Sequence, residues 1–197
     1  ILGTMMASRM TIEECVSTMA RTLPVCRERH LAYATFTILQ IDHRTNTAYL
    51  AQYDNPSAIL LRGGAHADYP VTGRTVGEKT VLESRIPLQA EDMLVLCTDG
   101  VTNAGLGKTM VNGWPRSEVI RYLETTCLPV SHSPQQVAAG LVGAGRDLCL
   151  GSPDDDITVL AAKMRTRRTV NVLAGPPADM AWDGKVLKRF FQSEGLH

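Results

Sequence analysis

Short connections between β-rich segments are the feature that most limits the folds open to this chain. Residues 33–42, 47–54 and 57–64 are rich in β-branched and aromatic residues, and only a few turn-forming residues separate them. Because such short connections join antiparallel neighbours, we predict an antiparallel meander. Residues 79–88 and 92–99 have similar composition and are expected to extend it.

Helical patterns lie on both sides of these strands. Residues 12–23 carry apolar side chains at helical spacing, and Thr11 with Glu14 forms a capping-box pattern. The other predicted elements are helices at 1–10, 115–127, 133–150 and 183–193 and strands at 156–164 and 169–175. This order predicts an α+β fold in which helices are layered on antiparallel sheet.

Composition excludes several classes of partner. The chain has 197 residues, enough for one substantial domain, and its 20 basic residues balance 20 acidic ones. No overall charge therefore favours nucleic acid or an anionic membrane surface, and no apolar run approaches a membrane span. The five cysteines are widely separated and lack zinc-site spacing, which predicts reduced thiols in a cytoplasmic protein.

The segment "MLVLCTDGVTNAG", residues 93–105, places Asp99 at the end of an apolar strand. An Asp-Gly pair can form a tight hairpin turn, but a hairpin needs a return strand immediately after it. The residues that follow Gly100 are rich in glycine and show no alternation of apolar and polar side chains. We therefore predict that Asp99 ends a strand without starting a hairpin, and we treat it as a candidate site residue.

A second group of carboxylates occurs in "GSPDDDITVL", where Asp154, Asp155 and Asp156 precede a predicted strand. Adjacent carboxylates repel one another unless cations compensate, so this loop is either a hydrated turn or part of a cation site. Oxygen ligands without histidine or cysteine suit Mg²⁺ or Mn²⁺. Aspartates at two strand ends could hold two ions and a hydroxide for attack on phosphorus. Sequence spacing leaves open whether the two loops meet.

The order of these motifs over residues 1–164 resembles that of the metal-dependent PPM (PP2C-type) protein phosphatases, specifically their SpoIIE-like bacterial branch. "LVLCTDGV" matches the family's apolar-x-Asp-Gly motif, which implies that Asp99 binds metal. "SPDDDITVL" resembles the later Gly-x-x-Asp-Asp/Asn-hydrophobic-Thr/Ser motif. The resemblance implies that Asp155 is a metal ligand and Asp156 its neighbour in the metal site, with Thr158 at the hydroxyl position.

Two details of the resemblance leave alternatives open. A shift of one residue in the alignment would make Asp154 the ligand in place of Asp155. The segment "AQYDNPSAILLRGG" is similar to the branch's strand-turn-strand Asn-Ala-Gly-His-Pro-Pro pattern, but Asn55 replaces the histidine.

The resemblance also implies an architecture. We expect a PP2C-like α-β-β-α sandwich of antiparallel sheets flanked by helices, with the phosphatase domain in residues 1–164 and a strand-helix extension in residues 165–197. The family's first metal motif, an Asp-Gly that precedes the first helix, is not present in the sequence. We expect it upstream of Ile1, with one or two missing N-terminal strands, so this fragment should bind metal weakly and be inactive alone.

The activity implied is that of an Mn²⁺- or Mg²⁺-dependent protein serine/threonine phosphatase. Two ions are expected in the complete domain, and a metal-bound hydroxide would hydrolyse phosphoserine or phosphothreonine on a regulatory protein. Asp99 and Asp155 would be the catalytic residues, and Asp156 would join them at the metal site. The expected substrate resembles a phosphorylated anti-sigma-factor antagonist. The alternative is a non-catalytic regulatory module that retains the phosphatase fold and binds partners.

Overall fold

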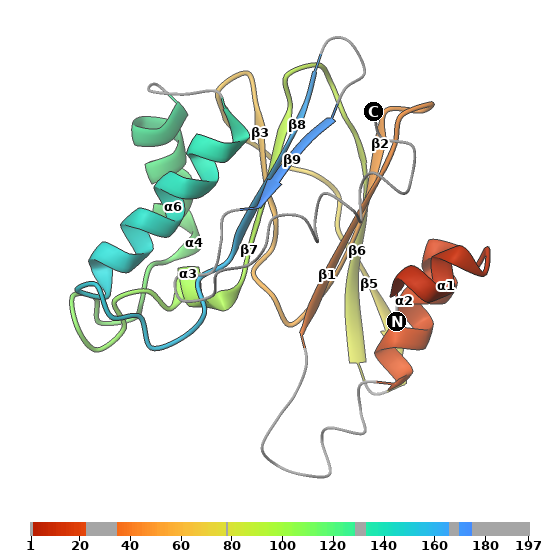
Figure 1. Ribbon diagram of the computed structural model, residues 1–197, viewed down its shortest axis with the longest axis horizontal. Helices are drawn as coiled ribbons and strands as arrows, with labels where there is room; N and C mark the ends of the chain where they lie inside the picture. The colour runs from red at the N-terminus through yellow and green to blue at the C-terminus, as the bar shows by residue number, and fades with distance from the viewer. Residues whose placement is uncertain (1, 23–34, 78, 129–132, 166–169, 175–197) are drawn as a thin grey trace. The chain divides into compact units, whose positions relative to one another are not determined.

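The computed structural model describes residues 2–22, 35–77, 79–128 and 133–165 and the backbone of residues 170–174 (Figure 1). The chain forms two compact units. Unit 1 comprises Ile1–Asn55 and Tyr69–Leu88, and unit 2 comprises Pro56–Asp68 and Gln89–His197. Among the described helices, none has the length and apolar character needed to span a membrane.

Unit 1 is a four-stranded antiparallel sheet with two helices. The strand order is β1-β2-β6-β5. The elements are α1 (Leu2–Ala7), α2 (Ile12–Thr22), β1 (Phe36–Asp42), β2 (Thr47–Tyr53), β5 (Thr72–Val76) and β6 (Lys79–Pro87). The buried side chain of Val16 in α2 belongs to the same apolar cluster as Ile38 and Val81 of the sheet. The amphipathic face of α2 is therefore buried in the core of unit 1.

The start of α2 confirms the predicted capping box. The backbone N–H of Thr11 donates to Glu14 Oε2 at 2.8 Å, and the backbone N–H of Glu14 donates to Thr11 Oγ1 at 3.3 Å. These reciprocal bonds satisfy two N–H groups that a helix N-terminus otherwise leaves unpaired.

Unit 2 is a five-stranded antiparallel sheet with helices. Its strand order is β4-β3-β7-β8-β9. The strands are β3 (Ile59–Arg62), β4 (Ala65–Ala67), β7 (Met93–Cys97), β8 (Val159–Met164) and β9 (Val170–Ala174). The helices are α3 (Asp99–Thr102), α4 (Arg116–Tyr122), the π-helix η2 (Leu123–Cys127) and α6 (Pro134–Leu148).

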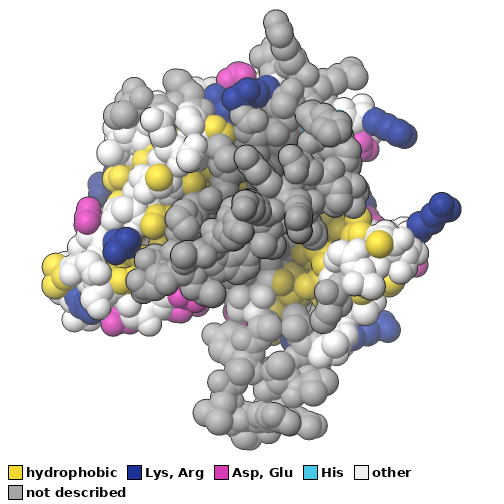
Figure 2. All heavy atoms as spheres, viewed as in Figure 1, with side chains coloured by type: hydrophobic (Ala, Val, Ile, Leu, Met, Phe, Trp, Pro, Cys, Tyr) yellow, Lys and Arg dark blue, Asp and Glu magenta, His cyan; other side chains and the backbone are white. Residues whose placement is uncertain are grey.

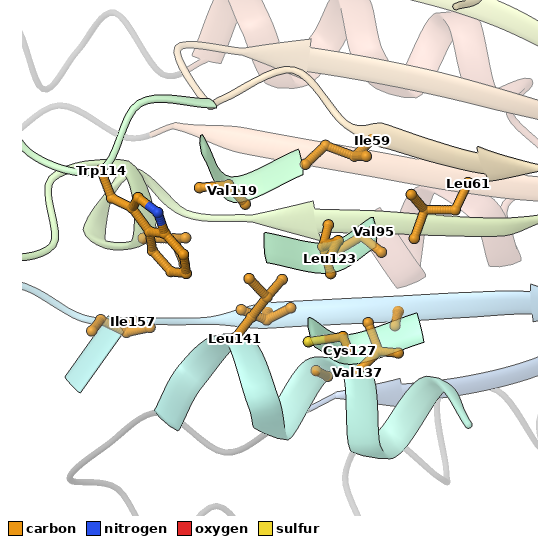
Figure 3. Close-up of a cluster of buried hydrophobic side chains, with 14 of the residues drawn as sticks. Ile59, Leu61, Val95, Trp114, Val119, Leu123, Cys127, Val137, Leu141 and Ile157 are labelled. Atoms are coloured by element: carbon orange, nitrogen blue, oxygen red, sulfur yellow. The ribbon is translucent and has the colours of Figure 1, made fainter. Parts of the chain in front are cut away.

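The core of unit 2 lies between these helices and the sheet. Figure 3 shows Val119, Leu123 and Leu141 from the helices beside side chains of β3 and β7. Leu123 and Leu141 are completely buried. This packing fixes the central strand β7 and the helices that follow it, and so positions the residues at the end of β7.

The structure confirms the α+β class but corrects the predicted meander. β2 pairs with β6, with Ala51 opposite Glu83, and β3 pairs with β7 in the other sheet. Asp54 has a left-handed backbone with φ of 54° and Pro56 follows two residues later, so the chain leaves the sheet of unit 1 after β2. A short connection therefore leads to a different sheet here. The short strands β4 and β5 were not predicted.

The helical predictions are confirmed with changed boundaries. The predicted helix at 1–10 is the short α1, and the predicted helix at 115–127 consists of α4 followed by η2. The last predicted helix, at 183–193, lies outside the described residues. The four described cysteines, Cys15, Cys97, Cys127 and Cys149, all have free thiols.

Candidate active site

The central strand of unit 2 delivers Asp99. β7 pairs with β3 on one side, where Ile59 faces Val95, and with β8 on the other, where Cys97 faces Val159. Met93 to Leu96 are all buried. A strand that is paired on both edges and covered on its faces needs a continuous apolar run, which explains the sequence pattern that precedes Asp99.

The residues after β7 confirm that Asp99 does not start a hairpin. Asp99 is the first residue of the short helix α3, and it is half-buried. Its backbone carbonyl accepts a hydrogen bond from Asn103 N–H at 2.7 Å. The chain therefore turns into a helix at this position, and Asp99 lies at the junction between strand and helix.

Hydrogen bonds join the junction of β7 and α3 to the acidic loop that precedes β8. Figure 1 shows the junction and the loop at the same end of the sheet. Thr98 Oγ1 donates to the Asp156 carbonyl at 2.8 Å and accepts from Thr158 N–H at 3.1 Å. The backbone N–H of Thr98 donates to the Thr158 carbonyl at 3.1 Å. The structure thus brings the two loops together, which spacing alone left open.

Gly100 allows this close approach. A Cβ atom at this position would lie 2.4 Å from the Asp156 carbonyl oxygen and 2.9 Å from its carbon. Both atoms belong to the backbone, so a side chain could not be accommodated by a change of rotamer. The Asp-Gly pair therefore serves two purposes: Asp99 contributes a carboxylate, and Gly100 lets the acidic loop lie against it.

Lys108 distinguishes Asp154 from its two neighbours. Its Nζ donates to Asp154 Oδ1 at 2.9 Å and to the Ser152 carbonyl at 2.6 Å. Asp154 is therefore already paired with a cation. The ion pairs of the described residues include none to Asp99, Asp155 or Asp156.

The other two acidic residues have different environments. One carboxylate oxygen of Asp155, Oδ1, accepts the Asp156 N–H at 2.8 Å, and both side chains are exposed. Asp156 contributes its carbonyl to Thr98 rather than its carboxylate. Within the described part of the chain, no three His, Cys, Asp or Glu side chains converge closely enough to hold a metal ion.

The donor set nevertheless fits a hard divalent cation. Asp99 and Asp155 offer carboxylate oxygens on two loops that are bonded together, and one or two carboxylates are the usual protein share of a Mg²⁺ shell that keeps several waters. Neither carboxylate is paired with a described Lys or Arg. The charge of these residues is thus available to a cation.

Sequence reasoning missed Arg116. Its Nε donates to the Ser57 carbonyl at 3.2 Å and its Nη2 to the Ala58 carbonyl at 3.0 Å. Because β3 and β7 are antiparallel, residues that precede β3 lie at the same end of the sheet as residues that follow β7. Arg116 is therefore at the Asp99 end of the sheet. The Trp-Pro-Arg sequence at the start of a helix gave no indication of this contact.

Cys97, two residues before Asp99, is not a nucleophile at neutral pH. Burial raises the pKa of its thiol to about 11, with Arg116 lowering it and Asp99 raising it by smaller amounts. The reactive form of cysteine is the thiolate. The site therefore offers carboxylates and hydroxyl groups, not an activated thiol.

Asn55 and Thr158 also belong to segments that resemble family motifs. Asn55 belongs to unit 1, where its Nδ2 donates to Thr37 Oγ1 at 3.2 Å. Thr158 is half-buried and bonds to Thr98 through its backbone N–H and carbonyl. The structure thus places Thr158 beside Thr98, the residue before Asp99, in unit 2.

The fold of the chain is that of the PP2C-like phosphatase domains. The chain matches three structures of the phosphatase domain of the cell fate determinant SpoIIE from Bacillus subtilis. The first has 19% identity and a TM-score of 0.57 over 83% of this chain and 71% of that one. The second, described as Mn presoaked, has 17% identity and a TM-score of 0.58 over 84% of this chain and 72% of that one. The third, a crystal form without domain swapping, has 17% identity and a TM-score of 0.58 over 91% of this chain and 73% of that one.

The sequence comparison identifies the family. The family model described as Stage II sporulation protein E (SpoIIE) matches residues 1–165. The chain belongs to the SpoIIE family, and this membership supports a phosphatase function in general. A comparison with curated proteins gives no match.

Proposed function

We propose that this chain carries the metal-binding carboxylates of an Mn²⁺- or Mg²⁺-dependent protein phosphatase. The observation that carries the proposal is the contact between the two loops: Thr98 is bonded to both sides of the acidic turn, and Gly100 lies against the Asp156 carbonyl. This contact places the Asp99 strand end beside the Asp155 loop.

The aspartates of the two loops have different roles in the proposed site. Asp99 and Asp155 would hold the divalent ions, and Asp156 supports their geometry through its carbonyl bond to Thr98. The Lys108 pair favours Asp155 over Asp154 as the ligand, because Asp154 already has a lysine partner. The ions, when bound, would activate a water molecule and offset charge on the phosphoryl oxygens.

The proposed reaction is hydrolysis of phosphoserine or phosphothreonine on a regulatory protein in the cytoplasm, such as a phosphorylated anti-sigma-factor antagonist. Family membership and the likeness to a SpoIIE phosphatase domain support it. Arg116, at the same end of the sheet, has two of its donor groups on backbone carbonyls, so its position is fixed. A fixed guanidinium at this end would favour an anionic substrate over a neutral one.

The test compares conservative variants on p-nitrophenyl phosphate with Mn²⁺, in a form of the protein that includes the Asp-Gly motif expected upstream of Ile1. We expect Asp99→Asn and Asp155→Asn to lower kcat/KM by at least about 100-fold, while Asp154→Asn, the matched change in the same loop, costs less than about fivefold. An Mn²⁺-dependent rise in melting temperature should be reduced in the first two variants. Phosphoserine, phosphothreonine and phosphotyrosine peptides compared under the same conditions would define the substrate class.

Three results would contradict the proposal. Full activity of Asp99→Asn would remove Asp99 from the site, and activity that persists in excess chelator would remove the metal. A stable protein that includes the upstream Asp-Gly motif and shows an Mn²⁺-dependent thermal shift but no turnover would instead support the alternative of a non-catalytic module. The thermal shift is measured without substrate, so metal binding and catalysis are separated.

A further inference from the structure

A cavity of about 640 Å³ lies in unit 2 between α4, α6 and residues 109–114. Trp114 and Tyr122 meet edge to face on its wall, with ring centroids 5.3 Å apart and an interplanar angle of 71°. Small residues of α6 line the opposite side, and a Cβ atom at Gly143 would meet nothing within 4 Å. The cavity therefore has room beside an aromatic pair, and its volume is in the range of ligand pockets.

The charged side chains that line the cavity are acidic. Glu118 of α4 and Asp147 of α6 both line it, and its described lining residues include no Lys, Arg or His. Glu118 reaches Arg121 only at 4.0 Å, and Asp147 forms no ion pair with any described residue. The Asp147 carboxylate is also near the Tyr122 hydroxyl: burial and the Cys127 thiol raise the pKa of Tyr122, and the charge of Asp147 adds to this rise.

An apolar rim continues from the cavity. Three large hydrophobic side chains adjoin residues that line it: Leu106 is 50% exposed, Val111 89% and Leu150 72%. Thr109 Oγ1 donates to the Leu148 carbonyl at 2.5 Å, so the loop that carries Leu106 and Val111 is bonded to the end of α6 that carries Leu150. Figure 2 shows in yellow the apolar side-chain surface that is exposed on one face of the molecule. Grouped exposed hydrophobics of this kind commonly mark interaction sites.

We propose that this cavity and its rim bind a segment of a partner protein that carries a lysine or arginine flanked by apolar residues. The cation would lie between Glu118 and Asp147 and against the aromatic pair, and the flanking apolar residues would cover Leu106, Val111 and Leu150. A basic group is favoured because the cavity contains two carboxylates and aromatic rings, which both attract cations. This binding function is additional to the proposed phosphatase chemistry and does not depend on it.

Tryptophan fluorescence can test the proposal directly. The chain has two tryptophans, so Trp182→Phe leaves Trp114, at the cavity wall, as the only reporter. The probe is the peptide Ac-Leu-Lys-Leu-Leu-amide, and its control has Glu in place of Lys. We expect a saturable change in Trp114 emission with the Lys peptide and none with the Glu peptide.

Two matched variants locate the binding. In the Trp182→Phe background, Asp147→Asn should weaken binding of the Lys peptide roughly two- to fivefold, as expected for a partly exposed ion pair. Asp68→Asn makes the same chemical change at another exposed aspartate of unit 2 that does not line the cavity, and should leave affinity unchanged. Added salt should weaken binding of the Lys peptide, and to a smaller extent in the Asp147→Asn variant.

Several outcomes would overturn the proposal. Equal binding of the Glu peptide, or equal affinity of the Asp147→Asn and Asp68→Asn variants, would remove the role of charge. Saturation by N-acetyl-lysine amide at the same concentrations would show a site for a small cation rather than a protein segment. Self-association that Leu150→Glu abolishes would show that a second copy of the chain covers the rim.

Discussion

Replacing Gly100 by alanine tests how closely the two loops approach. The added Cβ would lie 2.4 Å from the Asp156 carbonyl oxygen, about 1 Å short of the 3.4 Å at which ordinary contact begins. The neighbouring atoms are backbone, and Thr98 holds the same carbonyl by a 2.8 Å hydrogen bond. Relief of the clash therefore requires the acidic loop to move away from α3.

The size of the effect follows from this displacement. Forcing an extra methyl group into a packed position costs about 1–3 kcal/mol, which in a chain of this length lowers the melting temperature by about 2–12 °C. A shift of about 1 Å at a reacting centre can cost about 100-fold in rate. We therefore expect Gly100→Ala to lose most Mn²⁺-dependent phosphatase activity while the protein remains folded at 20 °C.

The assays are thermal unfolding by circular dichroism and turnover of p-nitrophenyl phosphate with Mn²⁺, the latter in a form of the protein that includes the upstream Asp-Gly motif. Gly143→Ala is the matched control, because a Cβ there meets nothing within 4 Å and the residue is inside α6. Alanine at a helix interior is better than glycine by up to about 1 kcal/mol, so this control should be slightly stabilised. A Gly100→Ala protein with unchanged melting temperature and activity would refute the close approach of the loops.

Three further predictions concern other parts of the two units. The side chain of Asp92 is 1% exposed and accepts hydrogen bonds from Nε and Nη2 of Arg62, so Asp92→Ala should lower the free energy of unfolding in urea by about 3–5 kcal/mol. Glu91→Gln removes the exposed partner of Lys163 and should lower it by less than about 1 kcal/mol. Equal losses in the two variants would contradict the burial argument. Since the pKa of Cys97 is raised to about 11, iodoacetamide at pH 8 should label it at least about 100-fold more slowly in the folded protein than in urea, as read by mass spectrometry. Arg74 holds the pKa of Glu83 below its ordinary value of 4.5, so the stabilising contribution of this pair is present above pH 4.5 and is lost as pH falls through the folded-state pKa. Glu83→Gln should therefore flatten the acid side of a plot of unfolding free energy against pH, and an unchanged slope would count against the pair.

Local patterns predicted the strand that ends at Asp99, because the burial and pairing of a strand determine its run of apolar residues. The apolar run before Asp99 corresponds to a strand paired on both edges, and the absence of a return strand after Gly100 corresponds to helix α3. A glycine directly after the aspartate can be explained by a turn, and only the structure shows that it is needed for contact with Asp156.

Pairing between distant segments could not be predicted in the same way. The connection from β2 to β3 is short, and nothing in its length distinguishes a hairpin from a change of sheet. β5 has mostly exposed residues and lacks an apolar alternation, so its sequence resembles a loop. The roles of Lys108 and Arg116 depend on partners 46 and 58–59 positions away, which no local pattern reports.

The pairing of β8 with β9 has a consequence for where this domain ends. The family match stops at residue 165, yet Leu160 to Met164 of β8 pair with Val170 to Ala174 of β9. A protein truncated at the family boundary would expose an open edge on β8, and open edges recruit foreign strands and promote aggregation. The same β8 carries the acidic loop at its start. The sheet of unit 2 therefore extends beyond the residues that the family model matches.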